Sequence, residues 1–421
     1  MSIISKIKEK LKNKDAKTLL ENFISLSALQ LVGMILPLLT LPYILRVVGF
    51  EKYGIIVFAA SLIAYFQSLT DFSFRITAVR DVAVFRNSTK KLNLIYSKVL
   101  IIKGLFLLVS LLIIGTIVFL VPSFYEYKWI YFYSSLLLVG YALFPEWFFQ
   151  GIEKMRYITY LNIGIKVFFT ICIFVFIKKE DDYWIYPLLQ GAGYIGAGII
   201  GQFLLIKKYK LKLIWLPKKV IFDTVKKNFP LFINQFVPTL YNNTSTFLLG
   251  LLGTKSMVGI YQAIMIIINI SITIIDVFSR VFFPFLNRKK DAFGNYKKLL
   301  LSISLVMSII ILVGYKLIFW YLNIHYEYAF LILLILVIGM NGYSLSNIFG
   351  LNYFIVQRKD KLVLKNTLRA SLIGFVLAFP LISYLGPIGA AINLSFSRWM
   401  MGGGLYLKYL NFRKDESSNT P

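Results

Sequence analysis

The residue types that most often hold metals or form disulfides are almost absent from this chain. It has one cysteine, Cys172, and one histidine, His325, in 421 residues. A single thiol excludes an intrachain disulfide and a cysteine metal cluster. The histidine stands beside Glu327 in a predicted loop, which is typical of a solvated side chain. We therefore expect neither a metal nor another cofactor.

Charged residues are also scarce, at 15% of the chain, whereas hydrophobic residues make up 58%. A soluble domain carries about a quarter charged residues, so this composition favours an integral membrane protein. A membrane-crossing helix needs about 20 predominantly apolar residues. A window of that length predicts an all-α polytopic protein with twelve transmembrane helices, at about residues 21–45, 54–74, 99–121, 129–150, 158–178, 184–206, 229–252, 258–281, 299–321, 328–352, 364–384 and 388–409.

Acidic residues are outnumbered by basic ones, 19 against 46, which gives a net charge of +27. The densest basic run, residues 207–227, fits either a nucleic-acid-binding patch or a cytoplasmic loop. With the N-terminus inside, 35 basic residues fall in predicted cytoplasmic segments and six in the outer turns. This bias follows the positive-inside rule. It predicts cytoplasmic N- and C-termini, a retained N-terminal tail and no nucleic-acid partner.

Several residues recur about 205 positions apart, at equivalent places in the predicted helices. The pairs are Asn22-Phe23 with Asn228-Phe229, Gln30 with Gln235, Gly49 with Gly253, Asp71 and Arg75 with Asp276 and Arg280, and Gln150 to Lys154 with Gln357 to Lys361. Matches in this order predict two homologous six-helix lobes, residues 1–206 and 228–421, joined by a basic cytoplasmic linker, residues 207–227. Because six is an even number, both lobes enter the membrane in the same orientation.

Five basic residues fall inside the predicted spans: Lys103, Lys166, Lys316, Arg369 and Arg398. A charge at the bilayer centre costs roughly 2.5 to 3.5 kcal/mol on insertion scales, so such a residue usually faces a partner or a water-filled cavity. Lys166 and Arg398 are near mid-span, and few acids lie at that depth. We expect them to face a cavity for an anionic solute, against the alternative of a buried structural pair. Lys103 and Arg369 are further candidates, with snorkelling to the inner surface as their alternative.

Two predicted helices carry polar residues that could form a binding face. Asn162 and Thr170 lie one turn on either side of Lys166, at i, i+4 spacing on one face. The predicted seventh helix carries Asn234, Gln235, Thr239 and Asn242. Such groups suit a hydroxyl-rich ligand, and hydrogen bonding between helices is an equally weighted alternative.

Acid-then-base pairs stand where two predicted helices leave the membrane inside. Asp71 with Arg75 and Asp276 with Arg280 have i, i+4 spacing, which predicts interfacial ion pairs. The alternative is a cytoplasmic gate in which the duplicated pairs exchange partners. Arg46, in the first outer turn, is a further candidate for such an ion pair.

One glycine pattern resembles a nucleotide site and is not one. The run from Gly191 to Gly196 fits the dinucleotide spacing, but it lies inside a predicted helix with no preceding strand. It predicts close helix packing, and no nucleotide partner is expected.

Motifs in the first four predicted helices resemble the Wzx-type flippases, the polysaccharide-transporter branch of the MATE/MOP exporter superfamily. They are Leu41-Pro-Tyr-Ile-Leu-Arg46, the segment from Gly49 to Gly54, Asp71-Phe72-Ser73, and Pro145-Glu-Trp-Phe-Phe-Gln-Gly-Ile-Glu-Lys-Met155. Ser73 departs from the family pattern, in which glycine follows Asp-Phe. The resemblance covers essentially the whole chain.

The resemblance implies two six-helix lobes around a cavity in the bacterial inner membrane. It implies a non-enzymatic flippase that moves undecaprenyl-diphosphate-linked oligosaccharide repeat units by alternating access, for O-antigen, capsule or exopolysaccharide synthesis. The implied partners are membrane lipid, a polysaccharide polymerase and a chain-length regulator. Two alternatives stay open: an ion-coupled multidrug exporter of the same superfamily, and a membrane-embedded glycan polymerase or ligase. A multidrug exporter would need carboxylates deep in the cavity. A polymerase or ligase would need large outer loops that carry catalytic acid and base residues.

Overall fold

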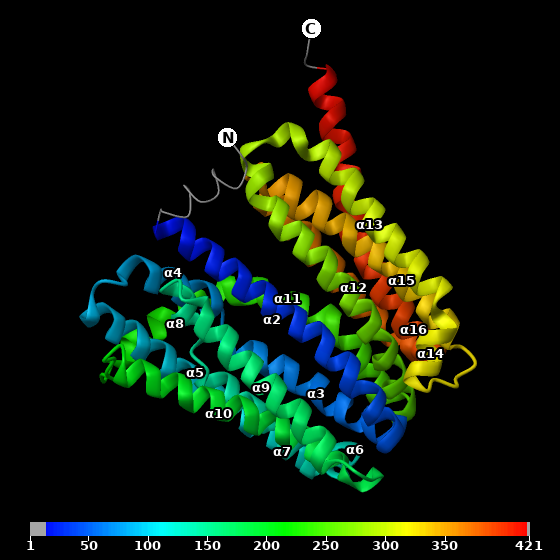
Figure 1. The fold of residues 1–421 in the computed structure, drawn as a ribbon, viewed down its shortest axis with the longest axis horizontal. Coiled ribbons are helices and arrows are strands. Elements are labelled where there is room, and N and C mark those ends of the chain that lie inside the picture. The colour runs from blue at the N-terminus through cyan, green and yellow to red at the C-terminus, as the bar shows by residue number, and fades with distance from the viewer. Residues whose placement is uncertain (1–13, 419–421) are drawn as a thin grey trace. The chain divides into compact units, whose positions relative to one another are not determined.

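A computed structural model describes residues 14–418 of the chain, and this part is helical without a β-strand (Figure 1). The predicted cytoplasmic tail falls largely on residues 1–13, outside the described residues. The helical structure of residues 14–418 confirms the all-α prediction. An all-helical fold is expected in a bilayer, because a helix satisfies its backbone hydrogen bonds internally where water is missing.

The helices of the first half of the chain are α2 (Lys14–Val47), α3 (Gly49–Asp71), α4 (Phe74–Phe85), α5 (Thr89–Leu120), α6 (Pro122–Tyr125), α7 (Lys128–Leu143), α8 (Glu146–Gly151), α9 (Met155–Phe176), the 3₁₀ turn η1 (Glu180–Trp184) and α10 (Ile185–Lys207). The second half contains α11 (Lys218–Leu252), α12 (Lys255–Arg288), the 3₁₀ turn η2 (Lys290–Ala292), α13 (Phe293–Val313), α14 (Tyr315–Leu322), α15 (Ala329–Leu345), the π-helix η3 (Ser346–Ile355) and α16 (Asp360–Ser418).

Ten helical segments within the described residues are long and apolar enough to cross a membrane. One of them, Asp360–Phe412, has 53 residues and is interrupted at Gly386, whose φ of 53° is not helical. It is long enough for two crossings. The polar helix α11, with 35 residues, is long enough for another. The protein is a multi-pass membrane protein, and these lengths are consistent with the predicted count of twelve.

Some predicted boundaries were wrong in an informative way. The span predicted to begin at residue 229 belongs to a helix that begins at Lys218, so half of the basic linker is helical. The span predicted at 299–321 is divided at Gly314 into α13 and α14. Hydropathy locates the apolar part of a helix and does not show where its polar turns continue.

Packing divides the chain into two compact units. Among the described residues, the first contains 14–40, 66–178 and 184–233, and the second contains 41–65, 179–183 and 234–418. Helices α2, α3 and α11 each contribute residues to both. These units are defined by contacts, so the predicted homology of the two halves and its boundaries stay a prediction.

In the first unit, glycines bring α7 and α10 together. A Cβ added to Gly191 would lie 2.6 Å from the Cβ of Leu136, and one added to Gly140 would lie 2.5 Å from that of Tyr194. Real Cβ atoms do not approach so closely. The prediction that the glycine run around Gly191 serves helix packing is confirmed.

The linker is held to the first unit by its backbone. The amide of Lys212 donates to Asn93 Oδ1 at 3.0 Å, and that of Ile214 donates to Ser97 Oγ at 2.8 Å. Both acceptors stand in the first turns of α5. The extended part of the linker therefore lies along this helix rather than hanging free.

In the second unit, α3 crosses α12 with backbone contact at two glycines. A Cβ on Gly54 would lie 1.7 Å from the carbonyl oxygen of Lys255, and a Cβ on Gly259 would lie 2.2 Å from that of Phe50. Phe50 and Gly54 precede Lys255 and Gly259 by 205 positions each. Gly54 therefore contacts Lys255, the counterpart of Phe50, and Gly259, the counterpart of Gly54, contacts Phe50. The contact is reciprocal in this sense. This reciprocity supports the predicted duplication.

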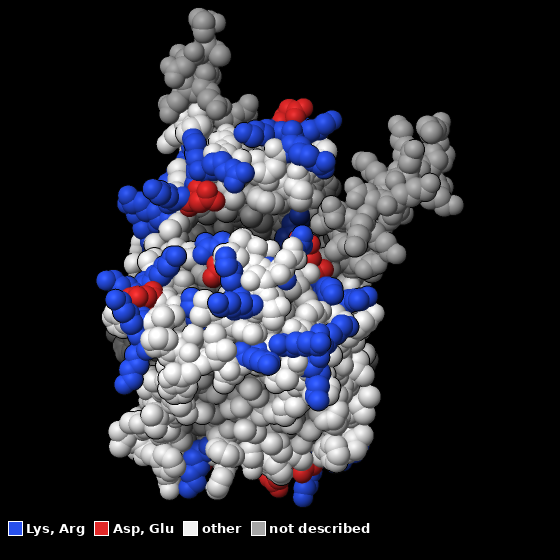
Figure 2. All heavy atoms as spheres, turned by 90° about the vertical axis from the view of Figure 1, so that its left-hand side faces the viewer, with Lys and Arg blue, Asp and Glu red and all other residues white. Residues whose placement is uncertain are grey.

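On the face that Figure 2 draws, Lys and Arg side chains clearly outnumber Asp and Glu. Exposed apolar side chains such as Leu112, Phe119 and Val313 belong to the predicted spans. Such exposure is expected where lipid is the solvent.

Candidate functional site

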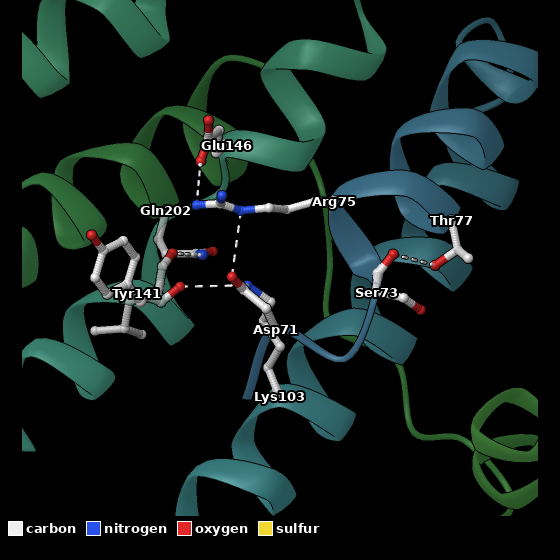
Figure 3. Close-up of polar contacts among 9 residues, drawn as sticks. Asp71, Ser73, Arg75, Thr77, Lys103, Tyr141, Glu146 and Gln202 are labelled. Atoms are coloured by element: carbon white, nitrogen blue, oxygen red, sulfur yellow. Dashed lines mark hydrogen bonds and ion pairs between the residues drawn. The ribbon is translucent and has the colours of Figure 1, made fainter. Parts of the chain in front are cut away.

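Four charged residues from four helices meet in the first unit. Lys103 Nζ lies 2.7 Å from Asp71 Oδ1, and Arg75 Nε lies 3.4 Å from Asp71 Oδ2. Arg75 Nη2 also lies 3.4 Å from Glu146 Oε2. We call these four residues the acid–base cluster (Figure 3). The Asp71–Arg75 ion pair expected from the i, i+4 spacing is present, within a larger network.

Lys103 is the most deeply buried member of this cluster. The residue is 4% exposed, and its ammonium also donates to the Tyr141 carbonyl at 3.4 Å. A buried charge is tolerated when it is paired and hydrogen-bonded. Lys103 is therefore engaged with Asp71 and does not snorkel to the surface.

A tight turn places Asp71 and Arg75 on the same side of the cluster. Helix α3 ends at Asp71, and Phe72 and Ser73 have φ values of 39° and 63°. Neither residue is glycine, so this left-handed backbone is strained. The ring of Phe72 stabilises the turn because it stacks on Phe106 at 4.6 Å and on Phe232 at 4.9 Å.

Lys166 also belongs to the first unit, on α9, and is half-buried. A Cβ on Gly33 of α2 would lie 2.6 Å from its Nζ atom, so the ammonium lies against bare backbone. No acidic side chain among the described residues forms an ion pair with it. Of its predicted companions, Asn162 donates to the Ile158 carbonyl of its own helix at 3.0 Å, and Thr170 is half-buried.

The second copy of the acid–base pair has a different environment. Asp276 Oδ1 accepts hydrogen bonds from Tyr343 Oη at 2.9 Å and from Asn347 Nδ2 at 3.2 Å. Among the described residues no ion pair within 4.0 Å joins it to Arg280, and the pairing expected from the i, i+4 spacing stays a prediction. Neutral donors hold this carboxylate, whereas cations hold Asp71.

The network around Asp276 continues through the π-helix. Ser279 Oγ donates to Asn347 Oδ1 at 3.1 Å, and Asn352 Nδ2 donates to Tyr296 Oη at 2.6 Å. Asn347 and Asn352 both belong to η3, and π-helical turns are frequent at functional sites. These polar partners were not predicted, because they are spread over α12, α13 and η3 without a local spacing.

Arg398 belongs to the second unit and is only 4% exposed. Its guanidinium lies 5.8 Å from the centre of the Tyr343 ring, so the structure brings Arg398 beside the Asp276 network. Arg369, on the same long helix α16, is exposed. Lys166 and Arg398 thus belong to different units.

The polar residues of α11 are largely bonded within the helix. Thr239 Oγ1 donates to the Gln235 carbonyl at 3.5 Å, and Asn243 Nδ2 donates to the Thr239 carbonyl at 3.2 Å. Asn234 and Gln235 are half-buried, and Asn242 is exposed.

Two further predictions concern Arg46 and metals. Arg46 Nη2 donates to the Tyr321 carbonyl at 3.2 Å, so it contacts a carbonyl rather than an acid. Among residues 14–418, no group of three or more His, Cys, Asp or Glu side chains is placed to hold a metal ion.

The fold is similar to the folds of two solved membrane proteins, a lipid II flippase and a MATE family transporter. The solved structure titled "Lipid II flippase MurJ, inward closed conformation" matches with a TM-score of 0.65 and 16% identity, over 93% of this chain and 87% of that one. An inward-facing multidrug resistance MATE family transporter of the MOP superfamily matches with a TM-score of 0.62 and 12% identity, over 95% of this chain and 100% of the other. At such identities the likeness shows the fold alone.

Residues 19–290 match the family described as polysaccharide biosynthesis protein, and the chain belongs to this family. A protein of Escherichia coli (strain K12) named "Putative O-antigen transporter" is 27% identical over 91% of this chain and 94% of its own length. A protein of the same name from Shigella dysenteriae is 23% identical over 90% of this chain and 96% of its own. Both are named as transporters, which agrees with the expectation of a non-enzymatic protein. The resemblance drawn from the motifs is confirmed.

Proposed function

We propose that this protein is a flippase for undecaprenyl-diphosphate-linked oligosaccharide repeat units in the synthesis of a surface polysaccharide. The observation that carries the proposal is the family match together with relatives named as O-antigen transporters, aligned over nearly the full length of both chains. The flippase fold agrees with it.

The residues supply chemistry that suits this substrate. Lys166 is a cation without an acidic partner among the described residues, which suits a diphosphate. Arg398 in the second unit is the other predicted phosphate contact, and Arg369 is a further candidate. Lys103, which was a candidate in the sequence, is already paired with Asp71. The amides of α11, with Asn162 and Thr170, suit sugar hydroxyls.

The proposed cycle is alternating access in the bacterial inner membrane with both termini cytoplasmic. The charge bias along the chain supports this orientation. The acid–base cluster is the proposed inner gate in the first unit, with Asp276 and Arg280 as its counterpart. A polysaccharide polymerase and a chain-length regulator are the proposed partners that receive the product.

A flipping assay in reconstituted vesicles tests the function and the role of Lys166 together. Lys166→Ala should lower the rate of repeat-unit translocation about tenfold, because it removes one charge-assisted contact to the diphosphate. Lys166→Arg should retain most of the activity. Lys316→Ala is the matched control, since Lys316 is an exposed lysine in another predicted span.

The outcomes separate the function from the site. Translocation by the unaltered protein, with equal rates for Lys166→Ala and the control, would keep the flippase and remove Lys166 from its site. Failure of the unaltered protein to move the lipid-linked sugar, with export of a cationic dye instead, would indicate the multidrug exporter.

A further inference from the structure

A small cavity lies in the first unit where α4, α5 and α11 meet. Its lining includes Thr77 and Arg80 of α4, Lys98 of α5, and Lys227 and Asn228 of α11, and its volume is about 100 Å³. Every lining residue belongs to that one unit. The lining residues lie in or next to two segments predicted to be cytoplasmic, residues 75–98 and 207–227.

The charge of this cavity is positive. Arg80, Lys98 and Lys227 each come from a different helix, and the only acid in the lining is Asp81. Arg80 Nε lies 3.6 Å from Asp81 Oδ1, so that pair is roughly neutral. Lys98 and Lys227 have no acidic partner among the described residues. Two cationic residues that line one cavity from different helices favour the binding of an anion.

The polar floor of the cavity is already bonded. Asn228 Nδ2 donates to Thr77 Oγ1 at 3.3 Å, Thr77 Oγ1 donates to the Ser73 carbonyl at 3.3 Å, and Thr224 Oγ1 donates to the Val220 carbonyl at 2.7 Å. Thr77 is 2% exposed and Asn228 is 8% exposed. The floor is therefore rigid, and the lysine ammonium groups remain as the donors for a ligand.

The volume of the cavity limits which ligands can bind there. A cavity of about 100 Å³ holds more than one water molecule. It is well below the roughly 300 to 1,000 Å³ of sites for drug-sized ligands, so a nucleotide or an oligosaccharide does not fit. A single phosphate group has a suitable size and charge for this cavity.

We propose that this cavity binds the phosphate group of an anionic membrane phospholipid. Phe74, Ile95 and Val99 line the same cavity as the lysines, and α5 continues from it into the apolar span. A phosphate joined to a lipid would meet both surfaces, whereas free phosphate would meet only the cations. The bound phosphate joins α4, α5 and α11 and so stabilises the turn that carries Asp71 and Arg75. The proposal does not depend on the transported substrate.

Lipid binding by the purified full-length chain tests this proposal. The probe is a fluorescent phosphatidylglycerol, added to nanodiscs of phosphatidylcholine and measured by energy transfer from the protein. Lys98→Gln and Lys227→Gln should each weaken its binding about tenfold, because each removes one charge-assisted contact. Lys226→Gln is the matched control, since Lys226 is exposed on α11 next to Lys227 and does not line the cavity. It should change the binding less than twofold.

Three outcomes would overturn the proposal. Equal weakening by the control variant would mean attraction by the whole basic face. Equal binding of a fluorescent phosphatidylcholine would mean ordinary lipid contact. Competition by inorganic phosphate at the lipid concentration would identify free phosphate as the ligand. Lys227 is exposed, so Lys227→Gln should fold. The test therefore stays decisive even if Lys98→Gln fails to fold.

Discussion

Ser73 has a left-handed backbone conformation that glycine would adopt with less strain. Its φ of 63° is in the left-handed region, which costs a residue with a Cβ about 1 to 2 kcal/mol. Its Oγ atom is buried and has no hydrogen-bond partner among the described residues. The departure from glycine in the family motif therefore falls on a position where the backbone favours glycine.

Ser73→Gly should raise the free energy of unfolding by about 1 kcal/mol. Glycine removes the Cβ strain and the unsatisfied hydroxyl, and this gain exceeds the roughly 0.5 to 1 kcal/mol that glycine costs through the unfolded chain. Thermal unfolding in detergent measures the change. Ser73→Ala keeps the Cβ and should gain less than glycine. A lower melting temperature for the glycine variant would contradict the assigned strain.

At this scale, the Asp71–Arg75 pair was expected from its i, i+4 spacing. The two residues belong to α3 and α4, and the left-handed turn at Phe72 and Ser73 between the helices brings them together. The engagement of Lys103 with Asp71, and of Asp276 with Tyr343, could not be read from spacing, because these partners are 32 and 67 residues apart. Arg398 was expected to face a cavity, with a buried structural pair as the alternative, and its buried position beside the Tyr343 ring depends on packing that spacing does not show.

At the scale of elements, the crossing of α3 and α12 depends on the absence of two side chains. The backbones touch at Gly54 and Gly259, so either Cβ would meet a carbonyl oxygen. Close approach of this kind is how small residues hold membrane helices together. The offset between the two glycines was visible in the sequence, but their contact was not.

Gly54→Ala and Gly259→Ala should each destabilise the protein by about 1 to 3 kcal/mol, the usual cost of overpacking. The double variant should cost less than the sum, because helices displaced by the first methyl already make room for the second. Thermal unfolding measures both effects. Gly115→Ala is the control, since a Cβ there meets nothing within 4 Å. An additive double variant would argue against one shared crossing.

Helix boundaries were the least predictable feature of the elements. The apolar runs correctly located the membrane-crossing segments of α5, α9 and α12. The early start of α11 at Lys218 and the π-helix η3 were missed, because polar helical turns and a change in helical hydrogen bonding leave no hydropathy signal.

For the whole molecule, orientation in the membrane is the prediction that most directly follows from charge. Native Cys172 is 7% exposed, so single introduced cysteines can be labelled over a low background. Trp215 is 95% exposed in the linker, and Glu180 is exposed in a predicted outer turn.

Trp215→Cys should react with a membrane-impermeant maleimide only in inside-out vesicles, and Glu180→Cys only in right-side-out vesicles. The reason is the excess of Lys and Arg in the segments predicted to be cytoplasmic. Gel-shift labelling measures both. The reverse pattern would overturn the proposed orientation, and a cysteine-free variant controls for Cys172.

The reciprocal contact at Gly54 and Gly259 also bears on how the chain arose. Two identical six-helix chains paired about a twofold axis would touch at one glycine from each, and a fusion of their genes would keep that contact within a single chain. A homodimer must accept every substitution twice, whereas a fused chain can alter one copy alone. Under the predicted duplication, the cationic partners of Asp71 and the neutral partners of Asp276 would record separate changes around the two copies of one carboxylate.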